Sequence, residues 1–129
     1  MKILISGSRK LADNTTYKML ENLLHTLQPT NILHGGATGV DTLAARYANT
    51  HNLPQTVIKP DYENRGRHAP LIRNTELVQL ADKVVCVYAA DRIRKGGTGD
   101  TYRKALKAGK LAAELIPQTN QLTKPLTLF

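Results

Sequence analysis

Three short glycine-rich segments contain the residue types that bind phosphate groups. Glycines allow backbone N–H groups to approach a phosphate closely, and a helix that starts at such a segment points the positive end of its dipole at the same place. Each segment comes after an apolar stretch expected to be a strand, and two such segments at one edge of a sheet would form a phosphate cradle. The segments comprise Gly7, Ser8 and Arg9; Gly35, Gly36, Ala37, Thr38 and Gly39; and Gly96, Gly97, Thr98, Gly99, Asp100 and Thr101.

Four polar residues are candidates for further roles at this site. Asp41 follows Thr38 by three residues, so it either forms a capping box or accepts ribose hydroxyls and assists proton transfer. Asp100 stabilises a first helical turn or contacts the ligand. Arg73 is suited to bind a phosphate, and Asn74 is suited to bind a ribose or a base. The alternative is that Arg73 is an ordinary surface residue and Asn74 has a structural role. Asp41, Asp100 and Arg73 are the catalytic candidates, and no catalytic residue is assigned.

Several familiar site types are disfavoured by the sequence. The G-x-G-x-x-G fingerprint and the Gly-Lys-Ser/Thr ending of a phosphate loop are both absent, so no standard nucleotide cofactor is expected. Ser8 has no evident partner base, and Cys86, flanked by valines, is expected to be an inert core residue. The histidines lack metal-ligand spacing, so no metal site is expected; they are His25, His34, His51 and His68.

Length and charge restrict the possible partners. A chain of 129 residues is one domain, and its single cysteine fits a reducing compartment. No apolar stretch is long enough to span a membrane, and the polar start is unlike a signal peptide, so we expect a cytoplasmic protein without a membrane partner. The net charge of +8 favours a polyanionic partner, either a phosphate-bearing small molecule or nucleic acid.

The positive charge is concentrated between residues 92 and 110, where Asp100 is the one acidic residue. With one Phe, five Tyr and no Trp, the chain offers few platforms for stacking bases, which disfavours single-stranded nucleic acid. The basic residues of this segment are Arg92, Arg94, Lys95, Arg103, Lys104, Lys107 and Lys110.

These residues are expected on a regular alternation of strands and helices. Apolar runs predict strands at 2–6, 31–34, 55–60, 83–89 and 111–117, and apolar spacings of three and four predict helices at 14–27, from Thr38 to about Asn52, from Pro70 to Ala81, and from Gly99 to Lys107. Such alternation predicts an α/β fold with a mostly parallel sheet of about five strands, covered on both faces. Ligands then bind beyond the carboxyl ends of the strands, where the glycine-rich segments lie. Residues 61–70 are expected to form a long functional loop, and residues 118–129 a tail after a single domain, 1–117.

The segments KILISGSR, HGGATGVD, the Arg73–Asn74 pair and GGTGDT together resemble the SLOG superfamily, specifically the small stand-alone YspA/YpsA-like proteins of bacteria and their phages. The resemblance spans residues 2 to about 116. It implies a Rossmann-like three-layer α/β/α sandwich that binds nucleotide-derived ligands in the cleft between these loops. It also implies homo-oligomerisation.

Relatives of this superfamily have different activities. The LOG-type phosphoribohydrolases cleave the base from a nucleoside monophosphate, the DNA-processing protein A family binds single-stranded DNA, and other members sense signals similar to cyclic ADP-ribose. Arg73, Gly96, Gly97 and Gly99 match the LOG motif. Asp100 replaces its threonine and Arg103 its catalytic glutamate, which reverses the charge that would stabilise an oxocarbenium-like transition state.

We therefore expect a binding protein that senses or sequesters a nucleotide-derived ligand of the ADP-ribose or cyclic nucleotide type. Phosphate is expected on the amides of the Gly35 and Gly97 loops, with Arg73 or Arg9 as its charge partner and Asp41 or Asp100 toward the sugar. A LOG-like phosphoribohydrolase and a single-stranded nucleic-acid-binding protein are the alternatives.

Overall fold

The computed structural model describes residues 1–117 and 121–123, the latter as backbone only. Strands and helices alternate along most of this range, as expected. In chain order the elements are β1 (Lys2–Gly7), α1 (Asn14–Leu27), β2 (Asn31–His34), α2 (Val40–Thr50), β3 (Gln55–Val57), α3 (Tyr62–Arg65), the 3-10 helix η1 (Gly66–His68), α4 (Ala69–Leu80), β4 (Lys83–Val87), the 3-10 helix η2 (Ala90–Arg92), α5 (Gly96–Lys107), β5 (Leu111–Ile116) and β6 (Gln121–Thr123).

The strands form one sheet in the order β3-β2-β1-β4-β5-β6. The first five strands of this order are mutually parallel, and β6 runs antiparallel to β5. The prediction of a mostly parallel α/β sheet is therefore confirmed. The order reverses at β1, which pairs with β2 on one side and with β4 on the other. In open parallel sheets this reversal opens a crevice between the two connections, where ligands bind.

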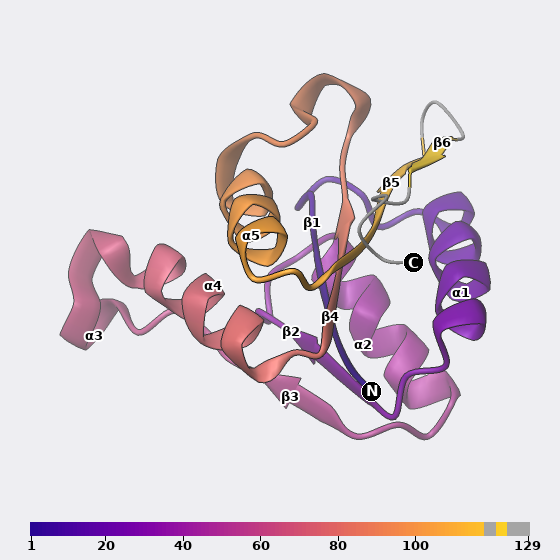
Figure 1. Ribbon diagram of the computed structural model, residues 1–129, viewed down its shortest axis with the longest axis horizontal. Coiled ribbons are helices and arrows are strands. Elements are labelled where there is room, and N and C mark those ends of the chain that lie inside the picture. Colours follow the sequence, from indigo (N-terminus) through magenta and orange to yellow (C-terminus); the bar gives the residue numbers. More distant parts are fainter. Residues whose placement is uncertain (118–120, 124–129) are drawn as a thin grey trace.

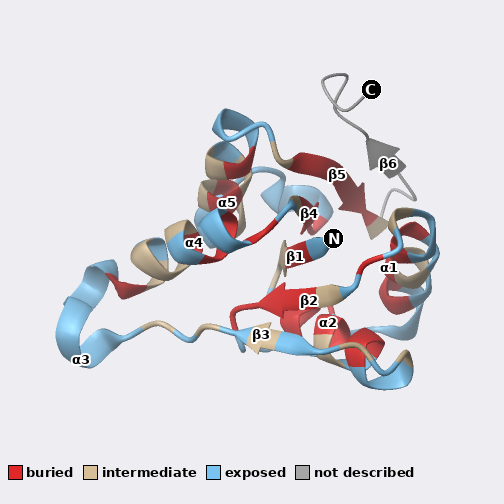
Figure 2. Ribbon diagram, turned by 60° about the horizontal axis from the view of Figure 1, so that its bottom comes forward, coloured by how far each residue is buried: buried red, intermediate tan, exposed pale blue. Residues whose placement is uncertain are grey.

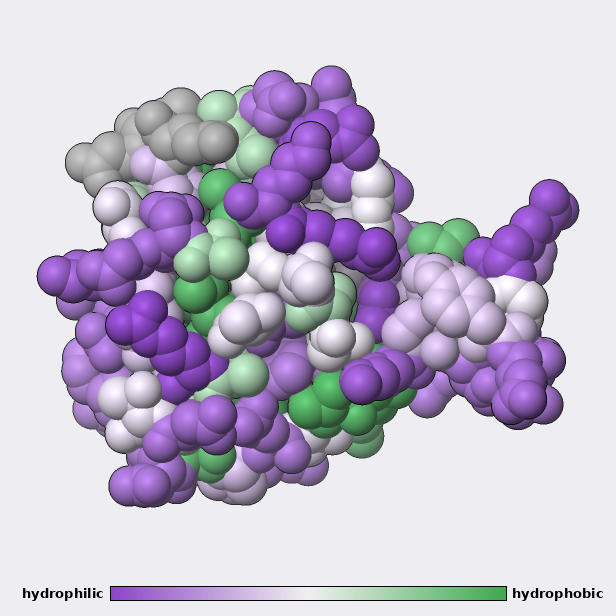
Figure 3. Space-filling model, turned by 180° about the vertical axis from the view of Figure 1, so that it is seen from behind, coloured by the Kyte–Doolittle hydropathy of each residue, from purple (hydrophilic) through white to green (hydrophobic). Residues whose placement is uncertain are grey.

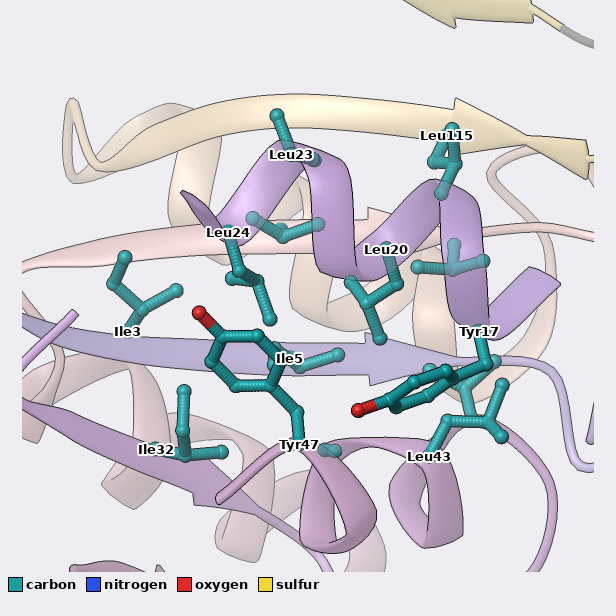
Figure 4. Packing of buried hydrophobic residues seen from close by; sticks show 14 of the residues in the cluster. Ile3, Ile5, Tyr17, Leu20, Leu23, Leu24, Ile32, Leu43, Tyr47 and Leu115 are labelled. Carbon is teal, nitrogen blue, oxygen red and sulfur yellow. The ribbon is translucent and has the colours of Figure 1, made fainter. Parts of the chain in front are cut away.

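Helices cover both faces of the sheet and complete three layers (Figures 1 and 2). Ile3 and Ile5 of β1 pack with α1 and α2, whereas Leu4 between them packs with α4 and α5, because successive side chains of a strand point to opposite faces. Figure 4 shows the first of these clusters, in which Leu20 and Leu24 of α1 are fully buried over β1. Each such leucine contributes about 1.5–3 kcal/mol of hydrophobic stabilisation.

The segment between β3 and α4 differs from the long loop that was expected. It contains α3 and η1, and η1 continues directly into α4. The Asp61 side chain caps α3 by accepting a hydrogen bond from the Asn64 amide at 3.3 Å. The residues of α3 show no apolar spacing that would predict a helix. Residues 61–68 are all exposed, and α3 projects from the rest of the molecule (Figure 1). We call residues 61–68 the arm.

The boundaries of other elements shift by a few residues. The second helix starts at Val40 rather than Thr38, and the last helix at Gly96 rather than Gly99, so the glycines of the third segment form its first turn. The third strand ends at Val57 and not at Pro60. Most of the expected tail lies outside the described residues. Within the described ranges, no helix has the length and apolar character needed to cross a bilayer.

Candidate functional site

A cleft of about 550 Å³ lies at the carboxyl ends of β1 and β4, where the strand order reverses. Its walls come from the β1–α1 loop, the β2–α2 loop, the start of α4, and the loop that joins β4 to α5. The volume lies within the usual range of small-molecule sites, about 300–1,000 Å³. The position agrees with the expected ligand site at the carboxyl ends of the strands.

Most of the predicted site residues line this cleft. Gly36, Thr38, Gly39, Gly99 and Asp100 are absent from its lining. The predicted residues that line it are Gly7, Ser8, Arg9, Gly35, Ala37, Asp41, Arg73, Asn74, Gly96, Gly97, Thr98 and Thr101. Their roles in ligand binding stay predictions, but the structure shows how each side chain is already engaged within the protein.

Asp41 organises the β2–α2 loop. Its side chain is buried, and Oδ2 accepts hydrogen bonds from the amides of Gly35 at 3.2 Å and Ala37 at 3.0 Å. The capping box with Thr38 is not formed, because the N-cap of α2 is Gly39 and has no side-chain cap. The amide of Val40 instead donates to the carbonyl of Ser8 at 3.0 Å, which joins this helix to the β1–α1 loop.

The first three amides of the β2–α2 loop are therefore committed to protein acceptors. The Gly36 amide donates to Nδ1 of His34 at 3.1 Å, beside the two amides held by Asp41. A phosphate on the Gly35 loop would compete with a carboxylate for the same donors. The expected phosphate position on this loop stays a prediction.

Arg73 is half-buried beside Asp41 and ties α4 to the neighbouring loops. Its Nη1 donates to the carbonyl of Gly35 at 2.9 Å, and its Nε donates to Oδ1 of Asn74 at 3.0 Å. Burial lowers the pKa of Arg73, the Asp41 carboxylate opposes this shift, and Arg9 lowers the pKa further. A Cβ atom at Gly35 would collide with Nη1 of Arg73, so this glycine makes room for the guanidinium group.

Asn74 fixes the start of α5 against α4. Its Nδ2 donates to the carbonyl of Gly97 at 3.3 Å and to Oδ2 of Asp100 at 3.2 Å. Asp100 also pairs with Lys104 at 2.7 Å. Asp100 therefore belongs to a network between two helices, and neither of its roles as a ligand or catalytic residue gains support from this geometry.

The N-terminus of α5 is the open part of the cleft. Lys95 is its N-cap residue and supplies no side-chain cap, so the first amides of the helix point outward from the turn formed by Gly96, Gly97 and Thr98. No protein atom lies within 4 Å of the position that a Cβ atom would occupy at Gly97. At Gly99, by contrast, a Cβ atom would collide with the carbonyl of Arg94, so Gly99 is required by packing.

An ion pair holds the loop that precedes α5. Arg94 donates from Nε and Nη2 to the carboxylate of Glu114 at 2.8 and 2.7 Å, and Glu114 is buried in β5. This pair raises the pKa of Arg94. The guanidinium group also lies over the ring of Tyr102 at 4.5 Å. Arg94 thereby ties the loop to the sheet. Its neighbours in the chain, Arg92 and Lys95, are cations that line the cleft.

The cleft is strongly cationic, and the sequence revealed only part of this charge. Asp41 is the one acidic residue among its lining residues. Lys10 and Arg67 were not predicted from the sequence as site residues. Lys10 adjoins the predicted Arg9, and Arg67 lies in the segment that was expected to be a functional loop. Arg92 and Lys95 were recognised only as part of a basic segment. The basic lining residues are Arg9, Lys10, Arg67, Arg73, Arg92 and Lys95.

Hydrophilic residues dominate one face of the molecule (Figure 3). From the side opposite to Figure 1, long hydrophilic side chains surround an area of pale, weakly polar residues, and the arm projects at one side (Figure 3). Arg103 stands where the similar LOG motif has its glutamate. It is exposed and is not a lining residue of the cleft. Across the described part of the chain, no group of His, Cys, Asp and Glu side chains is arranged to hold a metal ion.

Comparisons with known proteins agree with the fold. Residues 1–64 match the family model described as YspA, cpYpsA-related SLOG family. The chain is 33% identical over 132 residues to Gene 61 protein of Mycobacterium phage D29, and the alignment covers 96% of this chain and 98% of the phage protein. No solved structure gives a significant match. The matched family segment contains the β1–α1 and β2–α2 loops of the cleft.

Proposed function

Because the chain belongs to the YspA/cpYpsA-related SLOG family, we propose that its cleft binds a nucleotide or a nucleotide-derived ligand, of the ADP-ribose or cyclic nucleotide type, and senses or sequesters it. The family supports a nucleotide-related binding role or a LOG-like role in general. The observation that carries the proposal is an uncapped helix N-terminus in a cleft whose lining holds six basic residues and one acidic residue.

The phosphate of the ligand binds at the start of α5. The amides of Gly96, Gly97 and Thr98 donate to its oxygens, and the helix dipole favours its negative charge. Lys95 and Arg92 flank this position and add opposite charge. Charge-assisted hydrogen bonds of this kind are about twice as strong as neutral ones.

The sugar of the ligand lies toward Asp41 and Arg73. Asp41 uses Oδ2 for both loop amides, which leaves Oδ1 to accept a ribose hydroxyl. Arg73 uses Nε and Nη1 for protein acceptors, which leaves Nη2 to donate. Pro70, Leu71 and Leu77 line the adjacent wall and give the base an apolar surface.

Binding without turnover fits these contacts better than hydrolysis does. Glycoside hydrolysis in general uses a pair of carboxyl groups around the scissile bond, and Asp41 is the one carboxylate that lines the cleft. LOG-like hydrolysis is the second candidate, because Asp41 in the cleft is able to stabilise positive charge on a sugar.

Calorimetry with AMP, ADP-ribose and cyclic ADP-ribose tests binding, and chromatography of the same mixtures tests turnover. We expect at least one of these compounds to bind and to be recovered intact. Lys95→Gln should weaken its affinity severalfold, whereas Lys107→Gln, an equal charge change on an exposed residue outside the cleft, should not. Release of free adenine would replace the binding proposal by the hydrolytic one. Binding of single-stranded DNA but of none of these compounds would refute both.

A further inference from the structure

Gly35 is hydrogen-bonded at both its amide and its carbonyl by side chains that line the cleft. Its amide donates to Oδ2 of Asp41 at 3.2 Å, and its carbonyl accepts from Nη1 of Arg73 at 2.9 Å. A Cβ atom at Gly35 would lie 3.2 Å from the same Oδ2 and 2.8 Å from Cζ of Arg73. Asp41 and Arg73 are therefore held side by side, directly after the end of β2, and both line the cleft.

Each of these two side chains keeps one polar atom that no protein group uses. Asp41 uses Oδ2 for two backbone amides, and Arg73 uses Nη1 and Nε for protein oxygens, which leaves Oδ1 and Nη2. Among the described residues, the one fully enclosed side-chain polar atom without a hydrogen-bond partner is the Tyr88 hydroxyl. Neither Oδ1 nor Nη2 is thus sealed inside the protein. Since Asp41 is 8% exposed and lines the cleft, its free oxygen is available to a molecule in the cleft.

A free acceptor beside a free donor matches two neighbouring groups, one of which donates while the other accepts. A phosphate fits poorly here, because the carboxylate repels its negative charge. Each hydroxyl of a ribose both donates and accepts, and the 2′ and 3′ hydroxyls lie on adjacent carbons on the same side of the ring. One of them is able to donate to Oδ1 of Asp41 while the other accepts from Nη2 of Arg73.

We propose that Asp41 and Arg73 select a ligand whose ribose has both its 2′ and its 3′ hydroxyl free, and reject 2′-deoxynucleotides. This inference rests on the proposed function and narrows its ligand class. Nucleotides of the ADP-ribose type have this pair of hydroxyls, whereas a 3′,5′-cyclic nucleotide has its 3′ oxygen esterified. A deoxyribose would leave a charged, mostly buried group without its partner, and such a site discriminates strongly against the analogue that lacks the hydroxyl.

Calorimetry with AMP, 2′-deoxy-AMP and 3′-deoxy-AMP tests this selection on the unaltered protein, because the three compounds differ only in their sugar hydroxyls. We expect AMP to bind at least tenfold more tightly than either deoxy compound, since each lacks one hydrogen bond to a charged group. ADP-ribose provides the same comparison for a larger ligand. Cleavage of its vicinal hydroxyls with periodate, followed by reduction with borohydride, should weaken its binding at least tenfold.

The variant Asp41→Asn separates the sugar contact from the structural role of this residue. Its one remaining oxygen is able to accept from the amides of Gly35 and Ala37, whereas a donor replaces the oxygen that would accept from the ribose. We expect the preference for AMP over 2′-deoxy-AMP to fall below threefold, with the fold checked by circular dichroism. Asp91→Asn is the matched control, because Asp91 is exposed and lies outside the cleft lining, and it should keep the preference.

The possible failures of this inference and of the proposed function are distinguishable. If AMP and its deoxy analogues bind equally, the selection is refuted while the proposed function stands. If AMP does not bind and ADP-ribose does, equal binding of its intact and cleaved forms refutes it in the same way. A folded Asp41→Asn protein that keeps the full preference would refute the assignment to Asp41. If neither AMP nor ADP-ribose nor cyclic ADP-ribose binds, the proposed function itself fails.

Discussion

Replacing Gly97 by alanine should stabilise the protein and weaken its binding of nucleotides. Gly97 is the second residue of α5, and an added Cβ atom would meet no protein atom within 4 Å. Its backbone is helical, so alanine fits without strain. The protein itself has no need of a glycine here, whereas a phosphate on the helix N-terminus would occupy the space that the new methyl group fills.

The two expected effects have different sizes. Alanine is favoured over glycine in a helix by about 0.5–1 kcal/mol, which for a domain of this size raises Tm by roughly 2–5 °C. Loss of one hydrogen bond to a charged group costs about 1.5–3 kcal/mol. Since about 1.4 kcal/mol corresponds to a factor of ten, the affinity should fall about tenfold to a hundredfold.

Thermal unfolding and calorimetry with AMP and ADP-ribose measure the two effects on one preparation. Gly109→Ala is the matched control, because Gly109 also has no protein atom within 4 Å of the Cβ position and does not line the cleft. Its φ of +70° lies in the left-handed region, so alanine there should cost about 1 kcal/mol or more. The control should therefore lose stability and keep its affinity.

Unchanged affinity in Gly97→Ala would contradict the close approach of a phosphate to the backbone of Gly97, which is the reason we expect the methyl group to weaken binding. A fall in Tm would contradict the open space beside Gly97. Parallel changes of stability and affinity in both variants would show that binding follows folding and not the local contact.

Three further predictions concern the framework around the cleft. Asp13→Ala should lower the free energy of unfolding by about 1 kcal/mol at pH 7, because Asp13 caps α1. Hydrogen bonds from Thr16 lower the pKa of Asp13 below 3.8. The Asp13 carboxylate therefore stabilises the folded state fully above that pH, and this stabilisation is lost as the pH falls through the lowered pKa. Urea titrations that show the same difference in free energy of unfolding between the wild type and Asp13→Ala at pH 2.5 and pH 7 would contradict this. Arg94→Gln should cost about 2–3 kcal/mol, since it leaves Glu114 buried without its partner, and chemical denaturation that shows a loss under 0.5 kcal/mol would exclude a structural role for the pair. Burial raises the pKa of Cys86 to about 12, so thiol labelling at pH 8 should require unfolding, and complete labelling within minutes of the native protein would disprove its inertness.

The fold was predictable because its signals are local and repeated. Apolar runs such as KVVCV and leucine spacings such as those of α1 identify strands and helices without tertiary information. The arm was not predictable in this way. α3 has four residues, none of them buried, and the Asp61 side chain at its start accepts two hydrogen bonds from Asn64. A pattern based on apolar spacing cannot detect a helix that contributes nothing to the core.

The candidate site was predictable by position but less so by role. Arg73, Asn74 and Asp41 are polar residues next to glycine-rich loops, and the sequence favoured ligand contacts for them as much as structural ones. In the structure their strongest hydrogen bonds go to the protein backbone or to each other. These groups are buried among loops, and buried polar groups find protein partners whether or not a ligand binds.

The three glycine-rich loops look alike in sequence, yet their glycines are packed differently in the structure. A Cβ atom at Gly35 would strike Arg73, one at Gly39 would strike the backbone of Ser8 and Arg9, and one at Gly7 would strike Val40 and the carbonyl of Val87. These glycines exist because two loops and two helices meet closely at the carboxyl ends of β1 and β2. In the same region, the amides of Gly35, Gly36 and Ala37 donate to protein acceptors. At the start of α5, by contrast, Lys95 supplies no side-chain cap, and the ion pair of Arg94 and Glu114 holds the preceding loop, so we expect a phosphate to bind there.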